Sequence, residues 1–197
     1  MFRNSNIESI EKIWNNAKKK TTSYKEQKTE QVNRYLERIK DIPADEIVYI
    51  DETGINTCIY REYGYAPRGQ KVYAKISGRK FQRTNIVSGK MGNKIIAPMQ
   101  YNGTTDSALF EFWFENCLLS SVGKGQTIVM DNAAFHRKSE LHYLAKKHQC
   151  KVIFLPPYSP ELNPIEKLWA CLKKYLKFNL SSFSSLNDAI YSFFKVK

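Results

Sequence analysis

The stretch LPPYSPELNPIEKLW, residues 155–169, constrains the local fold more than any other part of the sequence. Its four prolines fix their own backbone angle and restrict the residue before each of them, so this connection has little freedom to move. The sequence therefore predicts a rigid connection that leads into a helix and places Glu166 in its first turn. The apolar residues of that helix recur at helical spacing, at Ile165, Leu168, Trp169, Leu172 and Leu176.

Short apolar runs of strand length alternate with helical patterns after residue 45. Runs rich in β-branched residues are typical of strands, whereas apolar residues three or four positions apart are typical of helices. The order of these elements predicts a single α/β domain with a mixed β-sheet flanked by helices. We expect helices at 106–121, capped by Asp106, and at 139–149, and strands at 46–51, 71–77, 83–90, 93–103, 126–131 and 151–156.

The first 44 residues have a different pattern. They are rich in charge, and Pro43 ends the only helical pattern that we interpret among them. We expect residues 1–44 to form a partly helical linker arm and residues 45–197 to form the folded domain. The apolar positions of the helical pattern are Val32, Tyr35, Leu36 and Ile39.

Basic residues outnumber acidic ones by a wide margin. The formal net charge is +12 and the pI is about 9.5, which favours polyanionic partners, nucleic acid before an anionic membrane surface. No apolar run approaches the ~20 residues of a membrane helix, and the first residues lack the apolar core of a signal peptide. We therefore expect a cytoplasmic protein without a membrane partner. The four cysteines are scattered, which is typical of reduced thiols and not of a zinc site.

Two aspartates directly follow apolar strand patterns, Asp51 after IVYI and Asp131 after TIVM. A side chain at the end of a buried strand is held rigidly and is well placed to line a cleft. Asp also ends strands by opening turns or capping helices, and for either residue alone this structural role is the more frequent one.

Glu166 also has two interpretations. With Asn163 as helix cap and Pro164 at the first helical position, its carboxylate can reach back to the cap. It also lies beside the apolar stripe, where it can face a cleft. Three carboxylates on two strands and a helix could hold two Mg²⁺ ions about 3.5–4 Å apart, an arrangement that cleaves phosphodiesters.

The motifs YIDETG, MDNAAFH and LPPYSPELNPIEKLW together resemble those of the mariner-like superfamily of DDE transposases, especially its bacterial insertion-sequence branch. The resemblance covers residues 45–180, and the 34 residues between Asp131 and Glu166 are typical of that superfamily. It implies an RNase H-like fold, with Asp51, Asp131 and Glu166 as the catalytic triad that binds two Mg²⁺ ions, for which Mn²⁺ can substitute. It also implies cut-and-paste transposition in the bacterial cytoplasm, in which water cleaves the element ends and a freed 3′-hydroxyl attacks target DNA at a TA dinucleotide.

Three further residues match the family motifs. Asn132 and His136 fit the D-N-A-x-x-H pattern, and we interpret them as residues that order the loop after the second Asp. Direct metal ligation by His136 is disfavoured because Mg²⁺ prefers oxygen donors. Asn163 is interpreted as the helix cap. Glu52 stays outside the triad because adjacent residues on a strand face opposite ways.

Basic residues interleaved with tyrosines concentrate between residues 61 and 83. A charge run is usually a solvated face, but beside a nuclease site such side chains can contact DNA phosphates. The segment GYAPRG, residues 64–69, resembles a family loop that lies near the partner subunit, which implies a homodimer in the active complex. The candidates for DNA contact are Arg61, Arg68, Lys71, Arg79, Lys80, Arg83, Lys167 and Lys173.

The sequence departs from the family in one respect. Complete members carry helix-turn-helix DNA-binding domains upstream, and here only the arm KKKTTSYKEQ that usually follows them is present. We therefore expect a second reading frame, a truncated copy or an isolated catalytic domain, with a separate helix-turn-helix polypeptide as a further partner. Two alternatives stay open: a catalytically inactive nucleic-acid-binding remnant, and an RNase H-like nuclease or phosphatase that acts on another substrate.

Overall fold

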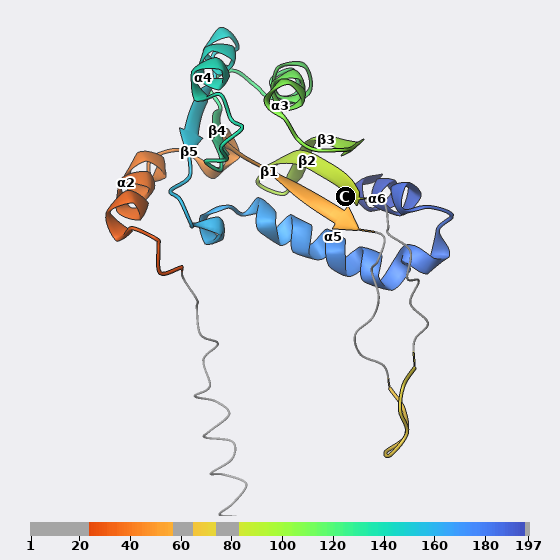
Figure 1. Ribbon diagram of the computed structural model, residues 1–197. Helices are drawn as coiled ribbons and strands as arrows, with labels where there is room; N and C mark the ends of the chain where they lie inside the picture. Colours follow the sequence, from red (N-terminus) through yellow and green to blue (C-terminus); the bar gives the residue numbers. More distant parts are fainter. Residues whose placement is uncertain (1–23, 57–64, 74–82, 196–197) are drawn as a thin grey trace, which may run out of the picture.

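A mixed sheet lies at the centre of the computed structural model, which describes residues 24–56, 65–73 and 83–195 (Figure 1). The strand order in these residues is β3-β2-β1-β4-β5. β1 pairs antiparallel with β2 and parallel with β4, β2 pairs antiparallel with β3, and β4 pairs parallel with β5. The strands are β1 (Ile47–Asn56), β2 (Arg83–Met91), β3 (Lys94–Asn102), β4 (Thr127–Met130) and β5 (Lys151–Phe154).

Helices cover both faces of this sheet. α3 and α4 lie on one face, and α5 and α6 lie on the other (Figure 1). The longer elements are α2 (Thr29–Ile39), α3 (Ser107–Trp113), α4 (Lys138–Lys147), α5 (Ile165–Asn179) and α6 (Leu186–Lys195). The short ones are η1 (Ala44–Glu46), a π-helical turn η2 (Phe114–Leu118) that continues α3, η3 (Pro160–Leu162) and η4 (Leu180–Ser182). The expected mixed sheet flanked by helices is thus confirmed.

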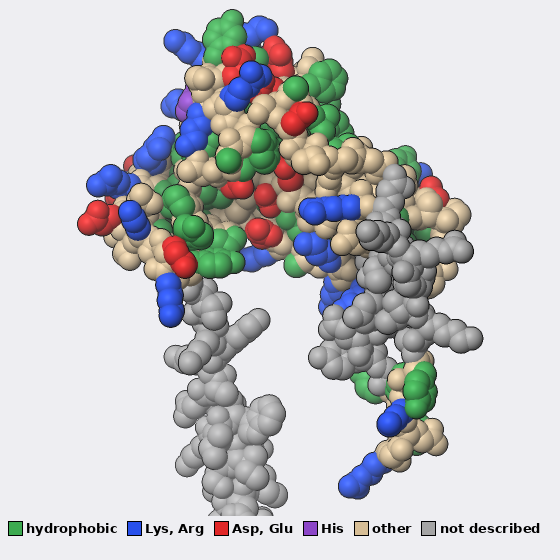
Figure 2. Space-filling model, in the orientation of Figure 1, with side chains coloured by type: hydrophobic (Ala, Val, Ile, Leu, Met, Phe, Trp, Pro, Cys, Tyr) green, Lys and Arg blue, Asp and Glu red, His purple; other side chains and the backbone are tan. Residues whose placement is uncertain are grey.

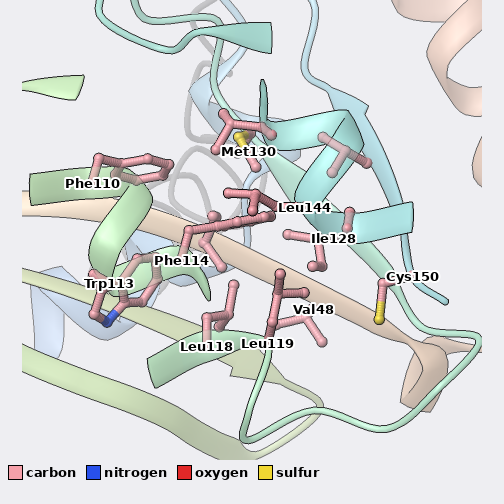
Figure 3. Packing of buried hydrophobic residues seen from close by; sticks show 14 of the residues in the cluster. Val48, Phe110, Trp113, Phe114, Leu118, Leu119, Ile128, Met130, Leu144 and Cys150 are labelled. Atoms are coloured by element: carbon pink, nitrogen blue, oxygen red, sulfur yellow. The ribbon is translucent and has the colours of Figure 1, made fainter. Parts of the chain in front are cut away.

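Alternation along β1 assigns its side chains to the two faces. Val48 and Ile50 pack under α3 and α4, in a core where Trp113 and Phe114 are fully buried (Figure 3). Ile55 faces the other way and packs with α5 and α6. This two-residue period places neighbouring residues of β1 in different environments.

α2 packs against the domain through Tyr35. This side chain is buried with Ile47 of β1, Val129 of β4, and Ile153 and Leu155 of the β5 segment. A helix that the sequence analysis assigned to the linker arm therefore supplies part of a hydrophobic core. The domain boundary near residue 44 stays a prediction.

Local sequence signals were mostly reliable. Asp106 caps α3, since its carboxylate accepts a hydrogen bond from the backbone N–H of Leu109 at 2.8 Å. The strand expected at 71–77 is wrong for 71–73, which are exposed and lack regular structure, and residues 74–77 lie outside the described part. A β-rich run needs a partner strand, which propensity alone does not supply. None of the described helices is long and apolar enough to cross a membrane.

Candidate active site

Asp51 lies in β1, and Asp131 directly follows the neighbouring strand β4. β1 pairs with β4 only from Ile47 to Tyr49, and β4 ends directly before Asp131. β1 itself continues to Asn56 because β2 pairs with it along this length. The expectation that Asp51 ends a strand is therefore wrong: the antiparallel ladder with β2 outweighs the turn preference of Asp. Asp131 does follow its strand, as expected.

Glu166 lies at the same pocket as the two aspartates. It is in the first turn of α5 and its side chain is exposed. In Figure 2 acidic side chains gather in a hollow near the centre of the visible face. The fold thus brings together the three acids selected from the sequence. The pocket has a volume of about 600 Å³ and is lined by Asp51, Asp131 and Glu166 together with Tyr24, Asn132, Ala133, Asn163 and residues 155–160.

These acids influence one another electrostatically. The pKa of Asp51 is raised to about 7, chiefly because burial disfavours its charged form and in part because Glu166 and Asp131 repel it. In the described part of the chain, no group of three or more His, Cys, Asp or Glu side chains has the geometry to hold a metal ion as it stands. Carboxylates that repel one another favour a cation between them.

Asp131 is held by the loop that follows it. Its Oδ1 accepts a hydrogen bond from the backbone N–H of Ala133 at 3.2 Å and lies 3.0 Å from Nε2 of His136. The His136 ring packs against Phe110 and Phe135, with centroids 4.3 Å away in each case. Nδ1 of His136 is buried and has no hydrogen-bond partner among the described residues, so the ring proton belongs on Nε2, where it is donated to Asp131.

Asp51 is held from the helix side. The indole Nε1–H of Trp169 donates a hydrogen bond to Oδ2 of Asp51 at 3.0 Å. Trp169 lies three residues after Glu166, so one turn of α5 provides both groups. In the sequence Trp169 belongs to the apolar stripe of this helix, and that pattern predicts only a packing role. A polar role had one available signal, because a buried indole N–H needs an acceptor.

A family model matches most of the chain, including all of these residues. Residues 46–188 match the family model described as DDE superfamily endonuclease. The chain belongs to this family. A comparison with curated proteins finds no match.

Solved structures of Mos1 transposase have the same fold as this DDE endonuclease. A Mos1 paired-end complex with the left transposon end has a TM-score of 0.69 and 19% identity, and the match covers 98% of this chain and 63% of that chain. The catalytic domain of Mos1 mariner transposase has a TM-score of 0.62 and 16% identity, over 90% of this chain and 86% of that chain. The expected RNase H-like fold is thereby confirmed. The chain spans less than two thirds of the Mos1 chain in the complex.

The sequence predicted Asn163 as the cap of α5, but its side chain makes no capping hydrogen bond to this helix. Its Nδ2 donates to the carbonyl of Ile50 at 3.3 Å, and its backbone N–H donates to Pro160. Its Oδ1 is buried without a partner among the described residues. Asn163 is buried against β1, so its amide bonds to the sheet instead of the helix. The capping interpretation of Glu166 therefore loses its support.

Glu52 faces away from Asp51, as expected, but it stays close to the site. The pKa of Glu52 is raised to about 7, mainly by burial and in part by the charges of Asp131 and Asp51, while a hydrogen bond with Thr105 lowers it. Glu52 lines a smaller cavity of about 120 Å³ together with Asp51, Asp131 and His136. Alternation predicted its face correctly but gave no sign that this face also borders Asp131.

None of the basic candidates that the structure of this DDE endonuclease describes lines the pocket. Arg61, Arg79 and Lys80 are outside the described residues. Arg68, Lys71, Lys167 and Lys173 are exposed.

Arg83 is exposed and has a defined orientation. Its Nε donates to Oδ1 of Asn85 at 3.0 Å, and its guanidinium lies against Gly54, where a Cβ would come within 2.2 Å of it. The DNA-binding role of this residue and of the other basic candidates stays a prediction.

The segment before α2 contacts the loop that leads to Glu166. Nε2 of Gln27 donates to the carbonyl of Tyr158 at 3.3 Å, to Oγ of Ser159 at 2.8 Å and to the Glu161 carboxylate. The rings of Tyr24 and Tyr158 lie 6.1 Å apart. Tyr158 has a positive φ of 59°, which is rare for a residue other than glycine. Nothing in the sequence signalled these contacts.

Proposed function

We propose that this chain is the catalytic part of a transposase, which cleaves DNA at the ends of a mobile element and joins those ends to target DNA. One observation carries the proposal. In a chain of the DDE endonuclease family, three acids from β1, from the end of β4 and from the first turn of α5 line one pocket. The chain is similar in fold to Mos1 transposase, whose structures include a paired-end complex and a strand transfer complex. This similarity supports DNA cleavage and strand transfer over other phosphodiester chemistry.

The chemistry of the pocket fits divalent metal ions. Asp51, Asp131 and Glu166 would hold two Mg²⁺ ions, with Mn²⁺ as a substitute, because carboxylate oxygens are the donors that these ions prefer. The pKa of Asp51 is raised chiefly by burial and in part by repulsion from Glu166 and Asp131, and a cation would relieve that repulsion. A Mos1 paired-end complex with Mn supports the assignment. When bound, such ions activate a water or hydroxyl nucleophile and stabilise the leaving oxygen of a phosphodiester.

The protein's own groups orient and hold this centre. His136 and the Ala133 amide fix the Asp131 carboxylate, and the rigid loop from β5 to α5 delivers Glu166. Asn132 lines the pocket beside them and we assign it, with His136 and Asn163, a supporting role.

The DNA substrate would be held mainly through its phosphates. Exposed basic residues such as Arg68, Lys71, Lys167 and Lys173 would contact phosphates. Among the described candidates Arg83 is the most preorganised, because its Nε donates to Asn85 and its guanidinium occupies the space that Gly54 leaves without a Cβ. This mode predicts DNA binding that tolerates different sequences and weakens steeply with salt. The partners that we propose are transposon ends, a TA-containing target, a second copy of the chain and a separate helix-turn-helix polypeptide. The compartment would be the bacterial cytoplasm.

A cleavage and strand-transfer assay tests the proposal. The wild-type chain is incubated with Mg²⁺ or Mn²⁺ and duplexes that carry the DNA flanking its own gene, beside scrambled duplexes and an RNA–DNA hybrid. We expect metal-dependent nicking of the flanking DNA and joining of its 3′ ends to a second duplex. Cleavage of the hybrid alone would assign the pocket to an RNase H-like nuclease. Binding of DNA without cleavage of any substrate would indicate an inactive remnant.

A further inference from the structure

Two buried tryptophans donate their indole N–H to different kinds of acceptor. Trp113 and Trp169 are 0% and 1% exposed, so each indole N–H needs a hydrogen-bond acceptor inside the protein. Trp113 donates to a backbone carbonyl, that of Ala97, at 2.8 Å. Trp169 donates to the carboxylate of Asp51 at 3.0 Å. The first partner is an ordinary structural acceptor, whereas the second is an acid of the candidate active site.

The bond from Trp169 is one of two links between α5 and the same part of β1. Asn163, just before the helix, donates to the carbonyl of Ile50, and Trp169 donates to the side chain of the next residue, Asp51. Glu166 lies between these two donors on the chain. The start of α5 is therefore fixed against β1 on both sides of the residue that delivers the third acid.

A carboxylate that accepts such a bond loses freedom of rotation. Asp51 accepts a hydrogen bond from the indole at Oδ2 and another from the backbone N–H of Glu52, so two donors orient its carboxylate, and the lone pairs that they do not use are left for another ligand. Partners that orient a ligating side chain in this way affect metal affinity without touching the metal. Phenylalanine would fill much of the same apolar space but has no N–H.

We propose that Trp169 is a positioning residue, whose indole N–H orients Asp51 for binding of a divalent cation. The inference rests on the proposed function of the pocket. Trp169 then has two roles, packing in the apolar core and donating a hydrogen bond to Asp51. Leu168 and Leu172 lie in the same core and contribute packing alone. The chemistry of the side chain predicts that loss of the N–H weakens cation binding while the apolar core stays filled.

The test measures Mn²⁺ binding by the EPR signal of free Mn²⁺ for the wild type, Trp169→Phe, Trp113→Phe and Asp51→Asn. Trp113→Phe is the matched control, because it also removes a buried indole N–H bond. We expect the dissociation constant for Mn²⁺ to rise on the order of tenfold in Trp169→Phe and to stay unchanged in Trp113→Phe. Melting temperatures without metal should fall similarly in both variants.

The results separate the two proposals. If Asp51→Asn binds Mn²⁺ as the wild type does, the pocket is not the cation site and the proposed function fails. If Asp51→Asn loses binding but Trp169→Phe keeps wild-type affinity, only the positioning role is overturned.

A second measurement needs no stable variant of Trp169. In ¹⁵N-tryptophan-labelled wild-type protein, addition of Mg²⁺ should shift the indole N–H resonance of Trp169 and leave that of Trp113 in place. Equal shifts of both resonances, or a shift of neither, would contradict the inference.

Discussion

Two groups of acidic residues differ in their neighbours: one group forms ion pairs with basic side chains, and the other lies beside further acids. On the helical side, Glu111 pairs with Arg137, and Glu115 pairs with Lys147 at 2.9 Å. In the pocket, Asp51 instead lies near Asp131 and Glu166 and feels their repulsion. Among the ion pairs of the described residues, His136 is the one cationic partner of a pocket acid, and only if it is protonated.

The shortage of partners in the pocket is not a shortage of basic residues. The sequence has 31 Lys and Arg residues against 19 Asp and Glu residues. None of the lysines and arginines that the structure describes lines the pocket, whereas the acids of α3 and η2 pair with basic residues at the two ends of α4. This difference can be tested by treating members of the two groups alike.

Neutralising a pocket acid should have the largest effect. Asp51→Asn, Asp131→Asn and Glu166→Gln should each reduce metal-dependent DNA cleavage by roughly a thousandfold or more, because each removes an anionic ligand with little change of shape. Glu111→Gln is the control from the helical group and should cleave at the wild-type rate. The measurement is the initial rate of nicking. Full activity of Glu166→Gln would return that residue to a structural role.

Metal binding should stabilise the protein through the pocket group only. At a Mg²⁺ concentration a hundredfold above its dissociation constant, the free energy of unfolding should rise by about 2.7 kcal/mol. For a domain of this size the melting temperature should rise by roughly 5–10 °C. Calorimetry or fluorescence melting should find this rise in the wild type and in Glu111→Gln, and no rise in Asp51→Asn. An equal rise in all three would show that the cation binds elsewhere.

Without metal, stability should depend on pH through the pocket. Folding raises the pKa of Asp51 from its ordinary value to about 7, so the folded state holds the proton more tightly than the unfolded state. This contribution is fully present below about pH 4 and is lost as the pH rises to about 7, at an expected size of roughly 1 to 3 kcal/mol. Glu52 has the same sign.

Melting curves in EDTA between pH 5 and 8 measure this effect. The wild type should lose stability over this interval, and Asp51→Asn should lose less, with Glu52 accounting for part of the remaining slope. A slope in Asp51→Asn equal to that of the wild type would mean that Asp51 titrates at its ordinary pKa.

The smallest effect should come from the helical group itself. Arg137 is exposed, with 62% of its side chain accessible, whereas only 12% of the Glu111 side chain is accessible, so water screens this pair on the arginine side alone. Arg137→Ala should leave cleavage unchanged and lower the melting temperature by no more than a few degrees, because it leaves the Glu111 carboxylate without its partner. A loss of cleavage in this variant would reveal a role in DNA contact that the pocket lining does not suggest.

Local patterns in the sequence predicted most of the elements. The short apolar runs in residues 126–131 and 151–156 predicted β4 and β5, and the stripe from Ile165 to Leu176 predicted α5. These signals work because backbone conformation and amphipathic periodicity depend on residues within one or two turns. The exceptions are also physical: Asp51 has the local signature of a strand end, but β2 pairs with β1 beyond it.

The sequence by itself selected the three acids that line the pocket, because the spacing and context of Asp51, Asp131 and Glu166 are properties of the chain. Only the tertiary structure decided how those acids are held. Trp169 and Asp51 are 118 positions apart, and Asn163 and Ile50 are 113 apart, so no local pattern could pair them. These hydrogen bonds can form only when the sheet and α5 have packed together, because burial is what makes an unpaired N–H costly.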